Sequence, residues 1–193
     1  MNAHKKKRQN HLSDTLMTAD SDINIVHLIK EQPEEGFRKL LEKYMRPIYW
    51  HIRRMVVSHE DAQDTTQETF VRIYRSIGQF RGESSLSTWI YRIATNEALR
   101  LIGKQHDIVS LDDADDNLFD MKSDDYIDYH DIEAVKMQKA IQSLPTKQKL
   151  VFNLRYYDEL KYEQIAEITD SCVATVKVNY HIAKKKIMEF MNA

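Results

Sequence analysis

The sequence predicts an all-α protein made of two small helical domains that an acidic, flexible linker joins. The 193 residues include only four glycines and three prolines, so the chain is poor in the residues that turns require. Apolar residues recur three and four positions apart, which is the spacing of one helical face. Charge is segregated, because two blocks that are each about four positive flank a strip of about eleven acids and one base.

The composition excludes several classes of protein. A single cysteine, Cys172, rules out an internal disulfide and a cysteine-based zinc cluster, and it fits a reducing compartment. No segment approaches the roughly 18 uncharged apolar residues of a membrane span. We therefore expect a cytoplasmic protein without a membrane span.

The first domain is predicted over residues 21–106, after a basic and disordered tail at 1–20. Ser21 or Asp22 is a candidate cap for a short helix, and Pro33 with two following acids begins the next. A third helix is expected at 60–79, with Phe70, Ile73, Tyr74 and Ile77 on one face. A fourth is expected at 85–102, with Leu86, Trp89, Ile90 and Ile93 on one face.

The linker is predicted over residues 107–131, where charge is high and no helical period is sustained. It is either a solvated loop or a segment that keeps DNA-binding surfaces off non-specific DNA. The second domain, 132–193, should contain helices at 132–144, 146–157, 161–169 and 174–190. Only four residues separate the last two, which indicates a helix-turn-helix.

The last helix is the clearest candidate for a functional surface. Val176, Tyr180, Ala183, Ile187 and Phe190 form a stripe that should pack on the domain, and the remaining surface is basic and hydrogen-bonding. In a helix-turn-helix the second helix enters the major groove of DNA. The alternative is an ordinary basic amphipathic helix.

Two further patterns lie in the first domain. Asp64, Gln67 and Glu68 share a helical face turned away from the apolar stripe, so they are free to meet a partner or simply face solvent. The segment FRGESSLSTW, 80–89, leads small hydroxyl residues into Trp89. Aromatic rings, small polar groups and a basic wall hold single-stranded nucleic acid, although Trp89 also falls on an apolar face. The wall would come from Arg72, Arg75, Arg81 and Arg92.

Catalytic motifs are absent from the sequence. His59 and Glu60 do not extend into HExxH, and no GxSxG, Walker loop or GxGxxG occurs. The eight histidines lack metal-ligand spacing. We therefore predict no enzyme activity, no cofactor and no metal site.

The order of these segments resembles a known family. DAQDTTQETFVRIYRSIGQFRGESSLSTWIYRIATNEALR, 61–100, resembles region 2 of the extracytoplasmic-function sigma factors of the sigma-70 family. LPTKQKLVFNLRYYDELKYEQIAEI, 144–168, with ATVKVNYHIAKKKI, 174–187, is similar to their region 4. The resemblance implies a transcription initiation factor that binds core RNA polymerase and directs it to promoter DNA.

The resemblance also implies roles for individual positions. Asp64, Gln67 and Glu68 would dock on the clamp coiled coil of the largest polymerase subunit, while region 4 would meet the flap of the second-largest subunit. An anti-sigma factor is a further expected partner. The melted minus-ten element would be bound by Arg81, Ser84, Ser85, Ser87, Thr88, Trp89, Arg92 and Asn96. The minus-thirty-five duplex would be read by Thr175, Lys177, Val178, Asn179, His181, Ile182, Lys184 and Lys185.

The chain departs from the family pattern at several positions. Asn179 and Ile182 stand where the family often has arginine, which puts the promoter sequence in doubt. Asp170 replaces a glycine in the turn, but Asp tolerates a left-handed conformation. Cys172 replaces a serine-like helix cap, and Ser171 is an alternative cap. Lys161 stands where the preceding helix usually has a serine cap.

Two alternative functions remain at this point. An autonomous helix-turn-helix regulator would explain the C-terminal helix but would leave Glu68, its neighbours and the 80–89 loop without a task. A sigma-mimic adaptor that sequesters an anti-sigma factor would have no need of Lys177 or of the lysines at 184–186.

Overall fold

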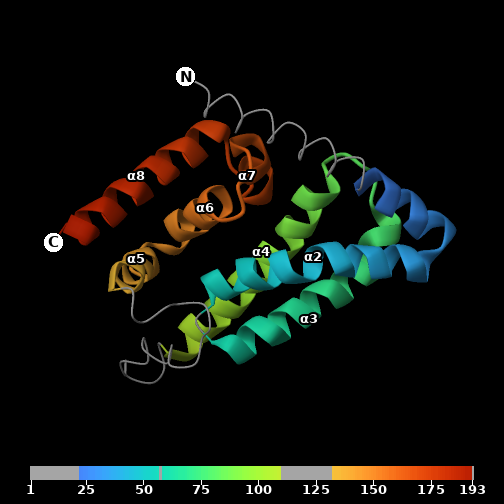
Figure 1. Ribbon diagram of the computed structural model, residues 1–193, viewed down its shortest axis with the longest axis horizontal. Helices are drawn as coiled ribbons and strands as arrows, with labels where there is room; N and C mark the ends of the chain where they lie inside the picture. The colour runs from blue at the N-terminus through green and yellow to red at the C-terminus, as the bar shows by residue number, and fades with distance from the viewer. Residues whose placement is uncertain (1–21, 57, 110–131, 193) are drawn as a thin grey trace.

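The computed structural model describes residues 22–56, 58–109 and 132–192, and these form helices without any strand (Figure 1). This confirms the predicted all-α fold. The predicted tail at 1–20 lies outside the described residues, as does most of the predicted linker, 110–131.

The first described element is a helical segment at 22–31, followed by α2 (Pro33–Met55), which starts at proline as predicted. Glu34 and Glu35 lie in its first turn, where acidic side chains favour the positive end of the helix dipole. Gly36 allows the two helices to approach each other closely. A Cβ atom at this position would lie only 2.4 Å from the backbone nitrogen of Ile29.

Asp22, a candidate helix cap, joins the segment 22–31 to α2 through its side chain. Its carboxylate accepts hydrogen bonds from the Tyr44 hydroxyl, at 2.7 Å, and from Lys43 Nζ, at 2.6 Å. Burial and the nearby Asp22 charge both raise the pKa of Tyr44 above its usual value, so its hydroxyl remains a donor. Ser21, the other candidate cap, lies outside the described residues.

Helix α3 (His59–Ser76) is capped by Ser58, whose hydroxyl accepts from the Asp61 N–H at 3.2 Å. A short 3-10 helix, η1 (Ile77–Gln79), follows it. Phe70 and Ile73 are buried as predicted. Tyr74, which was expected on the same helical face, is 55% exposed and packs edge-on against Phe37.

Helix α4 (Leu86–Val109) is longer than predicted, since it was expected to end at Ile102. Gly103 lies inside it, and one glycine in a helix costs only about 1 kcal/mol relative to alanine. The first residues of the predicted linker, 107–109, therefore belong to a helix.

The C-terminal part consists of α5 (Ile132–Gln142), α6 (Thr146–Tyr156), α7 (Tyr162–Ile168) and α8 (Val173–Asn192), which confirms the four predicted helices. On α8 the side chains of Val176, Ala183 and Ile187 are buried, and Tyr180 is partly buried. Phe190 was wrongly placed on the buried stripe, because it is 39% exposed in the last turn.

The turn between α7 and α8 shows how the unusual residues are accommodated. Asp170 has φ of 48°, the left-handed conformation that was predicted for it. The Ser171 hydroxyl bonds Thr169 at 2.7 Å, so Ser171 is not the cap of α8. Cys172 occupies the cap position, with Sγ 3.1 Å from the Thr175 hydroxyl.

The N-terminal and C-terminal helices pack against one another along two contacts, α4 with α7 and α2 with α6 (Figure 1). A single cluster of buried apolar side chains runs through both groups and includes Ile48 and Ile90 on one side and Leu154 and Ile165 on the other. The side chains that position the candidate site therefore come from both halves of the chain.

Candidate functional site

A pocket lies at the start of α4 and is lined by side chains from both halves of the chain. We call it the Trp89 pocket, and its lining residues are Gln79, Phe80, Arg81, Glu83, Ser84, Thr88, Trp89, Arg92, Glu167 and Asp170. Five of the eight residues predicted to bind the minus-ten strand are among them. The sequence did not predict Glu167 and Asp170, which come from α7 and the turn after it.

The loop that shapes this pocket depends on two local features. Gly82 has φ of 74°, a conformation that side-chain-bearing residues adopt at a cost. Ser85 caps α4, because its hydroxyl accepts from the Thr88 N–H at 3.1 Å and contacts the hydroxyls of Ser87 and Thr88. Ser85, Ser87 and Asn96 do not line the pocket, and Asn96 is exposed one turn beyond Arg92.

Trp89 both packs on the core and faces the pocket. Its indole is partly buried against the apolar cluster, and its ring lies 5.4 Å from that of Phe80 in a tilted arrangement. Trp89 therefore packs on the core and lines the pocket at once, so its burial leaves a stacking role open. A ring fixed on one side and open on the other loses little entropy when a base stacks on it.

The positive charge at this pocket comes from Arg81 and Arg92. Arg72 and Arg75 were expected to contribute, but they line a different groove, between α3 and α4. Arg72 Nε donates to Glu97 Oε1 at 2.9 Å in that groove. The basic wall is thus smaller than the sequence suggested.

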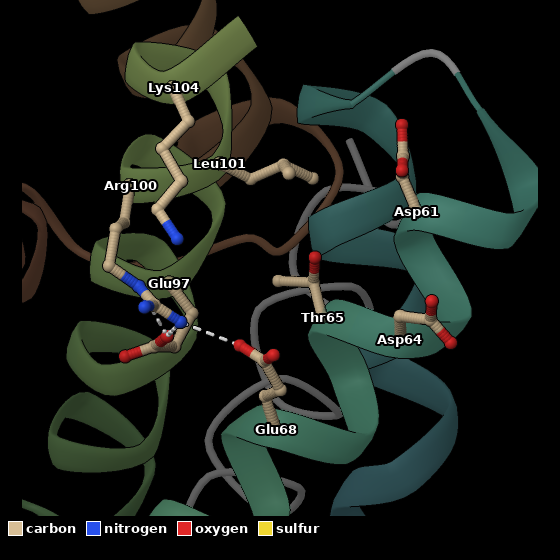
Figure 2. Close-up of a pocket in the computed structure, with 8 residues that line it drawn as sticks. All are labelled: Asp61, Asp64, Thr65, Glu68, Glu97, Arg100, Leu101 and Lys104. Atoms are coloured by element: carbon tan, nitrogen blue, oxygen red, sulfur yellow. Dashed lines mark hydrogen bonds and ion pairs between the residues drawn. The ribbon is translucent and has the colours of Figure 1, made fainter.

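Figure 2 shows the face of α3 and α4 that carries Asp64 and Glu68. Asp64, Gln67 and Glu68 are all exposed, as their helical spacing predicted. Glu68 is not solitary, because Arg100 donates to it at 2.6 Å and also to Glu97 at 2.7 Å. The face therefore presents one acidic group, Glu68, whose position is set by a cation on the neighbouring helix.

Glu97 is the centre of that arrangement, with a side chain only 2% exposed. A buried carboxylate requires paired cations to offset its lost hydration, and here Arg72 and Arg100 supply them. Sequence reasoning missed Glu97. Its only local signal was the spacing of three residues from Arg100, which is common on helices.

The outward face of α8 carries the residues predicted to read duplex DNA. Thr175, Lys177, Val178, His181, Lys184 and Lys185 are exposed, while Asn179 and Ile182 are half-buried. Lys177 and Lys184 lie over the rings of Tyr162 and Tyr180, with Nζ 5.6 and 6.0 Å from the centroids. These cation–π contacts hold two ammonium groups along one side of the helix.

Cys172 lies at the N-terminal end of this helix and is exposed. Hydrogen bonds from the Thr175 hydroxyl and from backbone N–H groups of the first turn lower the pKa of its thiol.

Within the described residues there is no group of acidic, histidine and cysteine side chains that could hold a metal ion. None of the described helices is long and apolar enough to span a membrane.

Comparison with known proteins decides the family. The model described as Sigma-70 region 2 matches residues 40–107, and the model described as Sigma-70, region 4 matches residues 134–187. The RNA polymerase sigma-H factor of Pseudomonas aeruginosa is 31% identical over 182 residues, which cover 89% of this chain and 94% of that protein. The chain belongs to the extracytoplasmic-function group of the sigma-70 family. It is a transcription initiation factor that directs RNA polymerase to promoters.

Other members of the family and solved structures agree. The ECF RNA polymerase sigma-E factor of Haemophilus influenzae is 32% identical, covering 86% of this chain and 93% of that protein. The sigma factor RpoE of Bartonella quintana, solved with the anti-sigma factor NepR, has a similar fold. Its TM-score is 0.70 at 20% identity, with 82% of this chain and 98% of that chain covered. CnrH, solved with the cytosolic domain of CnrY, gives a TM-score of 0.69 at 15% identity, covering 89% and 97%.

Proposed function

We propose that this sigma factor divides promoter recognition between two domains, region 2 at 21–106 and region 4 at 132–193. The Trp89 pocket captures the melted minus-ten strand, α8 reads the minus-thirty-five duplex, and the exposed face of α3 docks on core polymerase. The observation that carries this proposal is the convergence of an indole, two guanidinium groups and small hydroxyl groups in one pocket at the start of α4.

The chemistry of the pocket suits an unpaired base. Unstacking a base costs a few kcal/mol, so a site that binds the extruded base lowers the free energy of promoter melting without hydrolysing anything. Trp89 offers a ring for stacking, Ser84 offers a hydroxyl, and Arg81 and Arg92 offer charge to the phosphates. Ser87 and Asn96, which lie outside the pocket lining, would contact the flanking nucleotides.

Helix α8 supplies the duplex contacts. Its exposed N-terminal residues, Thr175, Lys177 and Val178, lie where a recognition helix meets base edges, and Lys184 and Lys185 lie where it meets phosphates. Asn179 is half-buried but can still present an amide, which is able to pair with adenine in two hydrogen bonds.

Two protein partners are assigned to two surfaces. Asp64, Gln67 and Glu68 form a polar patch for the clamp coiled coil of the largest polymerase subunit. The region 4 domain carries an apolar cavity for the flap of the second-largest subunit, lined mainly by Met137, Phe152, Tyr156, Tyr180, Ile187 and Met188. We expect the protein to act in the cytoplasm, to lack catalytic chemistry of its own, and to be restrained by an anti-sigma factor.

The decisive experiment is runoff transcription with purified core polymerase and a genomic promoter library. We expect transcripts from a narrow set of promoters that share two elements. An autonomous regulator would bind DNA but would not confer initiation on core polymerase, and that result would overturn the proposal.

A further inference from the structure

The two domains are joined by a buried polar contact centred on Asp158, which follows α6 in the region 4 domain. Its carboxylate accepts from Arg54 Nη2 at 2.5 Å and lies 3.0 Å from His51 Nδ1, and both of these residues are on α2. The same carboxylate raises the pKa of Tyr91, on α4, after the larger effect of burial. Region 4 thus places one anion beside an arginine, a histidine and a tyrosine of region 2.

This contact is enclosed by the two domains. The side chain of Asp158 is 4% exposed, that of Arg54 is 9% exposed and that of His51 is fully buried. His51 Nε2 lies 3.0 Å from the Thr95 hydroxyl, which holds the imidazole between the two helices. Removing one member of such a buried pair leaves the other charge without compensation, so Asp158 has a large influence on whether the domains stay together.

Some buried polar groups around this contact are poorly hydrogen-bonded, so the two domains can separate reversibly. Arg54 stacks on the Tyr157 ring at 4.7 Å, and the Asn153 amide reaches the Arg54 carbonyl oxygen at only 3.5 Å. Among the described residues, Asn153 Oδ1 and Arg54 Nε have no hydrogen-bond partner although both are buried. Each would gain hydrogen bonds to water if the seam opened, so separation is less costly than for a well-satisfied interface.

A second contact places region 4 over the Trp89 pocket. Gln164 on α7 accepts a hydrogen bond from the Lys161 backbone N–H at its Oε1 atom, at 3.0 Å. Its Nε2 atom donates a hydrogen bond to the Thr88 hydroxyl at 3.2 Å. One amide therefore caps α7 and fastens it to α4. The carboxylates of Glu167 and Asp170 then become part of the pocket lining beside Arg81 and Arg92.

We propose that the protein, when free of polymerase, holds itself in a closed state in which Asp158 latches region 4 onto region 2. In this state Glu167 and Asp170 occupy the side of the Trp89 pocket that a melted strand must approach. This inference rests on the proposed function, because it assumes that the pocket is the site of strand capture.

Charge and size both make the closed state unfit for a promoter. The phosphates of a strand in the pocket would face two carboxylates, and like charges repel strongly where water is partly excluded. The two promoter elements are about 25 base pairs apart, or roughly 85 Å at about 3.4 Å per pair. A compact chain of this size has a radius of gyration of only about 16 Å, so the domains must separate to reach both elements.

Polymerase is the ligand expected to open the latch. A partner shifts a two-state equilibrium only when it binds one state more tightly. The polar patch on α3 is already exposed in the closed state, and so are Tyr156 and Met188 at the apolar cavity of region 4. Docking of each domain on a separate polymerase subunit would therefore begin before the seam opens and would favour the open state.

The opening can be measured with groups that the chain already contains. Cys172 is the single cysteine, and it follows Asp170, which lines the pocket of Trp89. A dye on Cys172 that absorbs tryptophan emission reports the distance between domains, in a Trp50→Phe background that leaves Trp89 as the only donor. We expect efficient energy transfer in this background and a large loss of transfer in Asp158→Asn. Glu159→Gln removes the same charge from the next, exposed residue and should leave transfer unchanged.

Strand binding provides the second measurement, with a fluorescent single-stranded oligonucleotide and unlabelled protein. Asp158→Asn should bind about tenfold more tightly than the parent, the gain expected if about nine in ten molecules are closed. Unchanged energy transfer in Asp158→Asn would overturn the latch. Loss of transfer without tighter binding would overturn the claim that closure blocks the pocket.

Two further variants separate this inference from the function on which it rests. Glu167→Gln with Asp170→Asn should strengthen strand binding severalfold while energy transfer stays high, since both residues keep their shape and Asn also tolerates a left-handed conformation. No gain would overturn the electrostatic mask. Adding Trp89→Ala to Asp158→Asn should abolish the gain in binding. If it does not, the pocket is not the strand site, and the proposed function fails even though the latch exists.

Discussion

At the scale of single residues, Trp89 and Cys172 show how local context gives one side chain a particular property. Trp89 rests on the core and on Phe80, so packing holds its indole in place. Cys172 substitutes for a conventional cap residue at α8, and the same hydrogen bonds that complete the helix end act on its thiol. In both cases a structural contact also sets a property, the orientation of the indole or the pKa of the thiol.

Trp89→Ala should weaken single-strand binding by about 1–3 kcal/mol, which is about five- to 150-fold, because stacking is lost. Trp89→Phe keeps a ring on the same support and should lose much less. Fluorescence anisotropy with a minus-ten oligonucleotide measures both, and circular dichroism checks that α4 is intact. Equal affinities for the alanine variant and the parent would exclude a stacking role.

The Cys172 thiol should react with iodoacetamide faster than a free cysteine at neutral pH, because its lowered pKa leaves more thiolate. The rate should fall as the pH drops through that lowered pKa, at a lower pH than for an unperturbed thiol. Thr175→Val removes the side-chain donor and should shift the rate profile back toward higher pH. A profile that the valine variant does not move would show that Thr175 has no part in the effect.

At the scale of elements, α8 and the α3 face are helices with one side packed and the other free. On α8 the packed side is Val176, Ala183 and Ile187, and the free side is basic. On α3 the free side is acidic, but Arg100 of α4 reaches across to Glu68 and gives the patch a defined geometry. Opposite charge on the two helices suits opposite partners, DNA for one and protein for the other.

Lys184→Ala should reduce duplex affinity similarly for all sequences and lower the slope of log K against log salt by about 1, as expected for one lost phosphate contact. Lys177→Ala should also weaken binding to the upstream promoter duplex, since this residue lies nearer the start of α8. Lys30→Ala serves as the control, because Lys30 is exposed in the helical segment 22–31, which lies at the opposite end of the molecule from α8 (Figure 1). A salt slope that is the same in Lys184→Ala and Lys30→Ala would remove Lys184 from the DNA interface.

Gln67→Ala combined with Glu68→Ala should weaken binding to core polymerase by about tenfold or more, the loss of one or two significant interface contacts. Arg100 keeps Glu97 as a partner, so the fold should be unaffected. Glu42→Ala is a matched control. Glu42 lies on α2, away from the α3 patch, and it is an exposed carboxylate paired with Arg38 of the same helix. If both variants bind polymerase as the parent does, the docking face lies elsewhere.

At the scale of the whole molecule, the seam between α2 and α6 and between α4 and α7 joins two domains into one folded unit. The apolar cluster continues across this seam, and Asp158 adds a buried charge at its edge. Unfolding of either domain would expose the face that the other covers. The domains are therefore coupled in stability as well as in function.

Calorimetry should show one cooperative unfolding transition for the parent chain. Asp158→Asn should lower Tm by about 2–4 °C for each kcal/mol of coupling lost, or should resolve two transitions. Arg54→Met combined with Asp158→Asn should be less destabilising than the sum of the single changes, because both act on one contact. Additive effects would show that Arg54 and Asp158 stabilise the fold independently.

Much of the candidate site followed from spacing along single helices. The exposure of Asp64 and Glu68 and the outward face of α8 could be predicted because a period of 3.6 residues assigns each side chain to a side of its helix. Phe190 was placed wrongly, and Tyr74 is exposed on the same helix as the buried Phe70, because periodicity says which side a residue faces but not whether another element covers that side. Ser85, which was predicted to bind the minus-ten strand, also caps α4, a role that the sequence analysis did not assign to it.

The local order of residues thus accounts for the helices, the two-domain arrangement and the family, since each depends on interactions a few positions apart or on short motifs. The pairing of Asp158 with His51 and Arg54 joins residues more than 100 positions apart, so it belongs to no local pattern of the sequence. The same holds for Glu167 and Asp170 at the Trp89 pocket. Contacts of this kind arise only when separately formed helices pack, because packing alone determines which polar groups lose water together and must satisfy one another.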